Sequence, residues 1–192
     1  MLKELFISEV RVKMLHELLG KEREPLHVRE IVRRVGTEIN AVRRELDRLS
    51  KLGLLQAEAK GNRLYYRVNR DFALYPELMN LLAKDSGLGQ AIVEHRPKLG
   101  KIKLILMAAA LTKGRTAGQS DIDLLVVGEE VNLDLLQRLV AQAEKDYGHE
   151  LNYSVLSSEE FAWRKERKDN FILAILTQGR VVLAGDEELC RI

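Results

Sequence analysis

Two apolar runs joined by a loop of small residues constrain the fold of this chain more than any other stretch. Leu104–Met107 and Leu124–Val127 are apolar throughout, and the segment between them is rich in small and polar residues. Short apolar runs flanked in this way are typical of buried strands that meet at a loop. We therefore expect two neighbouring strands here, over residues 102–107 and 120–127.

The second predicted strand carries two acids at alternate positions, Asp121 and Asp123. Because side chains alternate across a strand, both carboxylates are expected to leave the same face, about 7 Å apart. Carboxylates placed in this way can hold Mg²⁺ or Mn²⁺, and such ions usually serve phosphate chemistry. Acids also occur at the polar ends of many strands that bind no metal, and that alternative stays open.

The composition is that of a globular chain of 192 residues, with 46% hydrophobic and 31% charged residues. No apolar run approaches the ~20 residues that span a membrane, and no signal-peptide pattern opens the chain. The single cysteine, Cys190, excludes an internal disulfide and fits a cytoplasmic location, and no zinc-ligand spacing is seen. Residues 1–96 hold 18 Lys and Arg against 14 Asp and Glu, a net +4, whereas residues 97–192 hold 13 against 15, a net −2. We therefore expect different partners for the two halves.

Residues 1–72 have the pattern of helices followed by a hairpin. A helical run from Leu5 ends at Gly20, and a short helix over residues 29–35 is closed by Gly36. Thr37 is expected to cap a longer helix, which carries the apolar stripe Val42, Leu46, Leu49 and Leu52. A helix, a glycine turn and a second helix predict a helix-turn-helix.

The hairpin signal lies just after the longer helix. Alternating runs over residues 54–59 and 64–68 flank Gly61-Asn62, which favours a two-residue turn, and Pro25–Val28 is a candidate short strand. Together with the helices, this hairpin predicts a winged helix. In that fold the longer helix enters the major groove of double-stranded DNA, and the hairpin tip lies near phosphates.

The candidate DNA-binding residues lie on the longer helix and at the hairpin tip. They are Thr37, Asn40, Arg43, Arg44, Lys51, Lys60 and Arg63. Arginine can read guanine or pair with phosphate. The alternative is a solvated helix face on which Glu38 or Glu45 makes weak surface ion pairs. We expect a homodimer, because readers of this kind usually bind two half-sites.

This module resembles the ArsR-like winged-helix regulators. The resembling segments are Arg11–Leu19, Val28–Ile31, Val42–Leu46, Leu49–Leu54 and Gly61–Tyr66. The resemblance implies a DNA-binding transcriptional regulator. Relatives in that family often sense metals through paired cysteines, which a chain with one cysteine does not carry over.

The rest of the chain is predicted to hold a connector and a second domain. Residues 73–97 favour one or two connecting helices, and residues 98–192 favour a small mixed α/β domain. Within this domain we expect, after the two strands, a helix capped by Asn132, a strand over residues 151–155, a helix over residues 159–176 that breaks near Asp169, and a last short strand over residues 180–184. The chain as a whole is thus predicted to be α+β.

This second half resembles the minimal nucleotidyltransferases of the polymerase-beta superfamily. The resemblance rests on Lys113-Gly114 and Ser120–Val126, and further along on Asn152-Tyr153, Ser158–Phe161, Phe171 and Leu183–Asp186. It implies that Asp121 and Asp123 are catalytic ligands of Mg²⁺ or Mn²⁺. It also implies that the loop binds a nucleoside triphosphate through Ala109, Ala110, Lys113, Gly114 and Ser120.

The sequence departs from that family pattern in two places. Ala109-Ala110 stands where the family has Gly-Ser, and Asn152 stands where a third acid is expected. Loss of phosphate donors alone can cost on the order of 10²-fold in rate. The preferred hypothesis is therefore a DNA-binding transcriptional regulator whose nucleotidyltransferase-like domain is catalytically weak or inactive. The alternatives are an active nucleotidyltransferase targeted by its winged helix and an antitoxin-like protein-interaction module.

Overall fold

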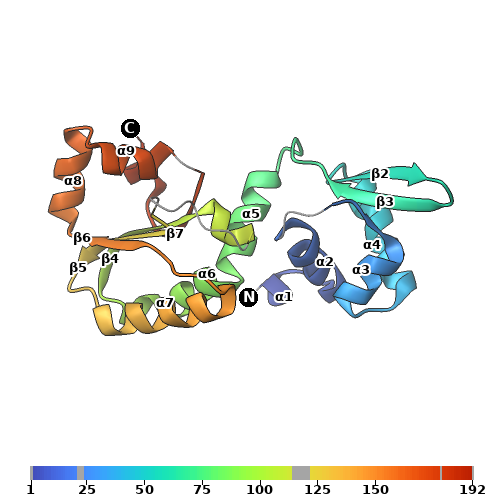
Figure 1. Cartoon of the computed structure of the whole chain (residues 1–192), viewed down its shortest axis with the longest axis horizontal. Coiled ribbons are helices and arrows are strands. Elements are labelled where there is room, and N and C mark those ends of the chain that lie inside the picture. The colour runs from blue at the N-terminus through green and yellow to red at the C-terminus, as the bar shows by residue number, and fades with distance from the viewer. Residues whose placement is uncertain (1, 21–23, 114–121, 178, 192) are drawn as a thin grey trace. The chain divides into compact units, whose positions relative to one another are not determined.

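The computed structural model describes residues 2–20, 24–113, 122–177 and 179–191, and the chain divides into two compact units, Met1–Leu82 and Ala83–Ile192. The division falls inside the predicted connector, near the end of the helix α5 (Tyr75–Lys84). The chain is a mixed α+β protein, as predicted, with a three-stranded sheet in the first unit and a four-stranded sheet in the second (Figure 1). Among the described residues, no helix combines the length and the apolar character needed to cross a membrane.

The first unit begins with four helices and one short strand. These are α1 (Leu2–Leu5), α2 (Glu9–Leu19), β1 (Leu26–His27), α3 (Val28–Val35) and α4 (Ile39–Lys51). The prediction of one helical run up to Gly20 was wrong, because the Ser8 side chain accepts a hydrogen bond from the Arg11 amide and starts a new helix. Gly36 closes α3 with a φ of 65°, as predicted.

Thr37 does not cap α4. The residue that precedes this helix is Glu38, which makes no side-chain capping bond, and the Thr37 hydroxyl instead faces the Val35 carbonyl at 3.5 Å. The tight turn after Gly36 therefore starts α4 one residue later than its sequence signal indicated.

The hairpin joins β2 (Leu55–Lys60) to β3 (Arg63–Val68), which also pairs with β1, so the sheet order is β1-β3-β2. Its turn is where the sequence predicted it, since Lys60 pairs with Arg63 across Gly61-Asn62 and Gly61 has a φ of 61°. The helices and the sheet share one apolar core, whose fully buried members include Met14, Ile31, Val42 and Leu46.

The second unit holds a mixed sheet with the order β6-β5-β4-β7, in which only β5 and β6 run parallel. Its elements in chain order are α6 (Gly87–His95), η1 (Arg96–Lys98), β4 (Lys101–Ala108), η2 (Ala109–Lys113), β5 (Leu124–Glu129), α7 (Leu133–Tyr147), β6 (Tyr153–Leu156), α8 (Ser158–Glu166), α9 (Asn170–Thr177), β7 (Arg180–Gly185) and η3 (Glu187–Cys190). The predicted cap at Asn132 and the predicted break near Asp169 are both confirmed.

The four-stranded sheet is buried on both faces. Ile105 and Met107 of β4 pack in one core with α6 and α7, whereas Leu104 and Leu106 pack in another with α8 and α9. Figure 1 shows these helix pairs on opposite sides of the sheet. This burial explains why β4 and β5 are continuous apolar runs without an alternating pattern.

Candidate nucleic-acid interface and carboxylate site

The helix α4 buries one face and exposes the other. Val42, Leu46 and Leu49 are at most 3% exposed, which turns Asn40, Arg43, Arg44, Asp47 and Lys51 toward solvent. Leu52, the last member of the predicted stripe, lies beyond the helix and is 60% exposed. The exposed face is therefore polar and basic, and it carries four of the residues that the sequence singled out.

Two arginines on this face are not paired with an acid among the described residues. Within the described residues, Arg43 and Arg44 form neither an ion pair nor a side-chain hydrogen bond, and both are exposed. By contrast, the Lys51 ammonium lies 2.7 Å from the carboxylate of Asp47 one turn earlier. The strongest uncompensated charge on α4 is thus in its first half.

A nearly buried carboxylate links α4 to α2, and the sequence did not reveal its burial. Glu45 was expected at most to join a surface ion pair, but it is only 7% exposed. The Arg11 guanidinium on α2 donates to it from Nε at 2.9 Å and from Nη2 at 3.3 Å, and Arg48 donates at 2.9 Å. Burial alone would raise the pKa of Glu45, but the hydrogen bond and charge of Arg11, with help from Arg48, outweigh burial and lower it.

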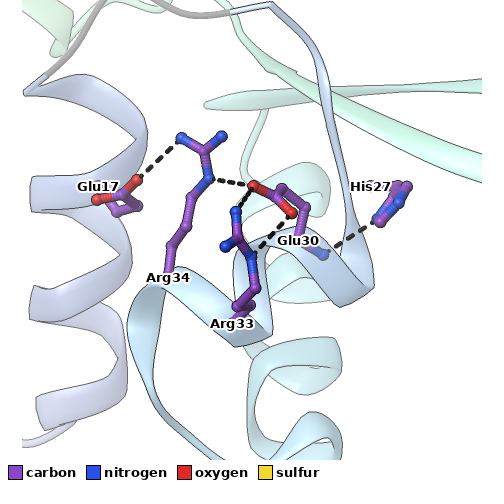
Figure 2. Close-up of polar contacts among 5 residues, drawn as sticks. All are labelled: Glu17, His27, Glu30, Arg33 and Arg34. Atoms are coloured by element: carbon purple, nitrogen blue, oxygen red, sulfur yellow. Dashed lines mark hydrogen bonds and ion pairs between the residues drawn. The ribbon is translucent and has the colours of Figure 1, made fainter.

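The arginines of α3 behave differently from those of α4. Figure 2 shows Arg33 and Arg34 converging on the carboxylate of Glu30, with Arg34 also reaching Glu17 on α2. The hydrogen bond from Arg33 lowers the pKa of Glu30. These two arginines are therefore already paired, and the network ties α3 to α2.

A histidine caps the same helix. The Nδ1 atom of His27 accepts a hydrogen bond from the Glu30 amide at 3.1 Å, so the proton of the neutral ring lies on Nε2 (Figure 2). The exposed Arg29, in the first turn of α3, forms no ion pair among the described residues. Arg29 was not among the predicted DNA-binding residues.

The hairpin adds a further row of basic side chains. Alternation along β3 puts Arg63, Tyr65 and Arg67 on one face, and Lys60 lies opposite Arg63 on β2. Lys60 is 3.8 Å from Glu58 and 6.0 Å from the centre of the Tyr65 ring, whereas Arg63 and Arg67 make no ion pair with the described residues. Arg67 follows Arg63 and Tyr65 at intervals of two residues, and this spacing in the sequence could have indicated that it shares their face of the strand.

The structure describes one of the two acids of the predicted carboxylate site, Asp123. The strand β5 begins at Leu124, so Asp123 lies in the bend before it, and Asp121 is outside the described residues. The predicted strand over residues 120–127 was therefore wrong at its start, because strand pairing begins only with Leu124 opposite Met107 and Tyr153. That the two carboxylates share one face stays a prediction, because Asp121 lies outside the described residues.

Asp123 is fully buried and hydrogen-bonded to the chain at Asn152. Its Oδ2 atom accepts the Asn152 amide at 3.0 Å, and its own amide donates to the Asn152 carbonyl at 2.7 Å. Asn152, predicted to lie within a strand, precedes β6 and is exposed. The structure thus brings together the second acid and the residue that stands where a third acid was expected.

The first residues of the small-residue loop follow β4, which is hydrogen-bonded to Asp123. Ala109 and Ala110 begin the turn η2, directly after β4, where the Ala108 amide donates to the Asp123 carbonyl at 2.8 Å. The Ala109 amide is occupied as well, because it donates to the Gly179 carbonyl at 2.9 Å. Lys113 ends η2, but its side chain, like Gly114, Ser120 and Asp121, lies outside the described residues.

Asp123 is the one predicted metal ligand that the structure describes. In the described part of the chain, no three His, Cys, Asp or Glu side chains gather as a metal site would need. The carboxylate of Asp123 and the amide side chain of Asn152 are oxygen donors of the kind that Mg²⁺ or Mn²⁺ takes. A scan of protein-family models, a search of curated proteins and a search of solved structures each found no match to this chain.

Proposed function

We propose that this protein is a transcriptional regulator that binds double-stranded DNA through a winged helix formed by its first unit. The observation that carries the proposal is the exposed, unneutralised basic face on α4, where Arg43 and Arg44 lie opposite the buried stripe of Val42, Leu46 and Leu49. The element order and the β1-β3-β2 sheet also suit a winged helix.

In the proposed complex, α4 lies in the major groove. Asn40 can donate to and accept from adenine, and Arg43 and Arg44 can bond guanine or phosphate. Lys51 at the end of α4, with Lys60 and Arg63 on the hairpin, contacts the backbone, and Thr37 lies at the turn that leads into α4. Arg33 and Arg34 are left out of this set, because Glu30 and Glu17 already neutralise them.

The regulator is proposed to act as a cytoplasmic homodimer, so that two α4 helices read two half-sites. The first unit exposes large apolar side chains that a second copy could cover, namely Leu5, Ile7, Leu74 and Leu81. A cytoplasmic location suits both a DNA reader and the buried free thiol of Cys190.

The second unit is proposed to have a nucleotidyltransferase-like fold with weak or no transferase activity. Support comes from the Asp123 carboxylate, which is fully buried and accepts a backbone amide, and from the neutral Asn152 beside it. A neutral amide attracts Mg²⁺ less strongly than a carboxylate does. Binding of a nucleotide or of Mg²⁺ without efficient transfer would fit an effector-sensing role.

The DNA-binding proposal predicts that Arg43→Ala combined with Arg44→Ala weakens binding by about 30-fold or more, since two well-placed base contacts at roughly 1–3 kcal/mol each sum to at least about 2 kcal/mol. The affinity is measured by fluorescence anisotropy on labelled duplexes selected from a random library by the wild-type protein. Folding should be unaffected, because both side chains are exposed.

The matched control removes two exposed cations from α7, by Arg138→Ala and Lys145→Ala. This control lowers the net charge by the same amount but should change affinity less than the α4 pair. Equal losses in the two double variants would leave only an unspecific charge effect and would refute a role for α4.

The proposal for the second unit predicts that wild-type protein transfers no radiolabel from α-labelled nucleoside triphosphates to protein, RNA or DNA in Mg²⁺ or Mn²⁺. The physical reason is the replacement of phosphate-binding and metal-binding groups at Ala109-Ala110 and Asn152. Clear labelling by the wild type that disappears in Asp123→Ala would overturn the proposed inactivity and establish a working transferase.

A further inference from the structure

A compact group of cations lies at the start of the second sheet, far along the chain from the first unit's basic residues. The segment 96–103 reads Arg-Pro-Lys-Leu-Gly-Lys-Ile-Lys, with four cations and no acid in eight residues. The second unit as a whole, residues 83–192, holds 15 Lys and Arg against 17 Asp and Glu, a net −2. The basic segment therefore stands out from a unit whose charge has the opposite sign.

The structure folds this segment around an open hollow. The turn η1 and the first residues of β4 line a depression of about 570 Å³, with Arg96, Lys101 and Lys103 around it and Glu129 as its one acid. Lys101 and Lys103 are both exposed and both line the hollow, on either side of the half-buried Ile102, where the pairing of β4 with β5 shifts its register.

The backbone that carries these cations requires a glycine. Gly100 has a φ of 111°, and a Cβ atom there would collide with the Glu130 carbonyl oxygen. The Asn132 amide also donates to the Leu99 carbonyl at 2.9 Å, which ties the turn to the segment that follows β5. The backbone of the turn that lines the hollow is thus held by a specific glycine and by a hydrogen bond to the segment after β5.

The charge of the segment 96–103 is only partly neutralised. Arg96 and Lys98 form no ion pair and no side-chain hydrogen bond among the described residues. Lys101 is 2.7 Å from Glu130, but both side chains are more than 70% exposed, so the pair is worth little in water. Glu129 accepts the Ser158 amide at 2.9 Å, and this bond, followed by the charges of Lys103 and Lys101, lowers its pKa.

We infer that Arg96, Lys98, Lys101 and Lys103 form a second nucleic-acid contact, which binds the phosphate backbone without reading its sequence. A row of exposed cations along a turn and a strand suits a polyanion better than a single small anion. No large apolar side chain of this segment is exposed, since Leu99 is 1% exposed and Ile102 is half-buried. The patch therefore lacks the groups that insert into a lipid interface.

This inference goes beyond the proposed reading of DNA by α4 and does not depend on it, because it concerns different residues in a different unit. Phosphate contacts supply affinity and salt dependence, whereas base contacts supply sequence choice. The two surfaces can therefore be separated by experiment. The probe is a fluorescein-labelled DNA duplex of random sequence, titrated with the full chain at several salt concentrations.

The test variant combines Arg96→Gln, Lys98→Gln and Lys103→Gln, all at exposed positions. Its affinity at low salt should fall about tenfold or more, and the slope of log K against log salt should become shallower by about 2 to 3, since each lost contact removes roughly 0.9. The control combines Arg138→Gln, Lys145→Gln and Lys168→Gln, which removes the same charge from exposed positions of the same unit.

Both triple variants are made with and without Arg43→Ala and Arg44→Ala. A loss confined to the 96–103 variant in either background supports the inference, even if the α4 pair proves to have no effect. Equal behaviour of the two triple variants overturns it. The inference is also overturned if the 96–103 variant binds DNA as the wild type does but no longer binds vesicles that contain anionic lipid. That result assigns the patch to membranes.

Discussion

Glu45 is a nearly buried carboxylate of the first unit. It lies on the same helix as Arg43 and Arg44 but faces the protein interior, where Arg11 of α2 holds it with two hydrogen bonds. This pair ties α4 to α2 and adds to the apolar stripe that turns Arg43 and Arg44 toward solvent. A nearly buried carboxylate left without its cation would be costly.

Replacing Glu45 by Gln should therefore reduce the free energy of unfolding by about 1–3 kcal/mol at neutral pH. Because the pKa of Glu45 is lowered in the folded protein, its stabilising effect is fully present above its ordinary value of 4.5 and is lost as the pH falls through the lower, folded value. The difference between wild type and variant should thus shrink below about pH 4.5. Urea unfolding followed by circular dichroism, at a series of pH values, measures this.

The matched control is Glu58→Gln, which removes an exposed hairpin carboxylate 3.8 Å from Lys60. Its effect should stay below about 0.5 kcal/mol, as is usual for surface pairs. An effect of Glu45→Gln that is no larger than the control's, or that does not vary with pH, would contradict a stabilising role for the Arg11–Glu45 pair.

Single residues also mark the limits of what the sequence could predict. The exposed side of α4 followed from helical periodicity, because Val42, Leu46 and Leu49 repeat at three- and four-residue intervals. The burial of Glu45 did not follow, because its cation, Arg11, is 34 residues earlier in the chain. The surroundings of Asp123 were missed for the same reason, since Asn152 becomes its neighbour only through the pairing of β5 with β6.

At the scale of elements, local signals were reliable where a glycine set the geometry. The hairpin turn at Gly61 and the end of α3 at Gly36 were predicted, because positive φ angles are costly for other residues. The starts of β5 and β6 were placed too early, because polar residues with a strand-like spacing precede both strands. Where a strand begins depends on its neighbours, which the sequence of the strand itself does not specify.

The turn between α3 and α4 gives a test at this scale. Gly36→Ala should lower the free energy of unfolding by about 1–2 kcal/mol, because alanine disfavours the left-handed conformation. No steric clash contributes, since an added Cβ meets nothing within 4 Å. Thermal unfolding measures the change.

Gly36→Asn serves as the control, because asparagine adopts this conformation more readily than alanine does and should lose less stability. Equal stabilities for wild type, Ala and Asn variants would show that the turn is not held in the left-handed conformation. In that case a left-handed residue at Gly36 could not be what ends α3 and leads the chain into α4.

At the scale of the whole molecule, the chain is two units with separate cores and different charge. Residues 1–82 hold 16 Lys and Arg against 12 Asp and Glu, a net +4, whereas residues 83–192 have a net −2. The predicted α+β class was correct in outline, and the division falls within the predicted connector. The apolar character of β4 and β5 predicted buried strands, but not which helices cover the sheet.

The central claim is that α4 contacts DNA, and photo-crosslinking tests it most directly. A photoreactive residue replaces Asn40, exposed on α4, or Asn80, exposed on α5, in the full chain bound to a labelled duplex. We predict efficient crosslinking from position 40 and little from position 80, at salt concentrations where binding is retained. Crosslinking from position 80 that equals or exceeds that from position 40 would contradict the claim.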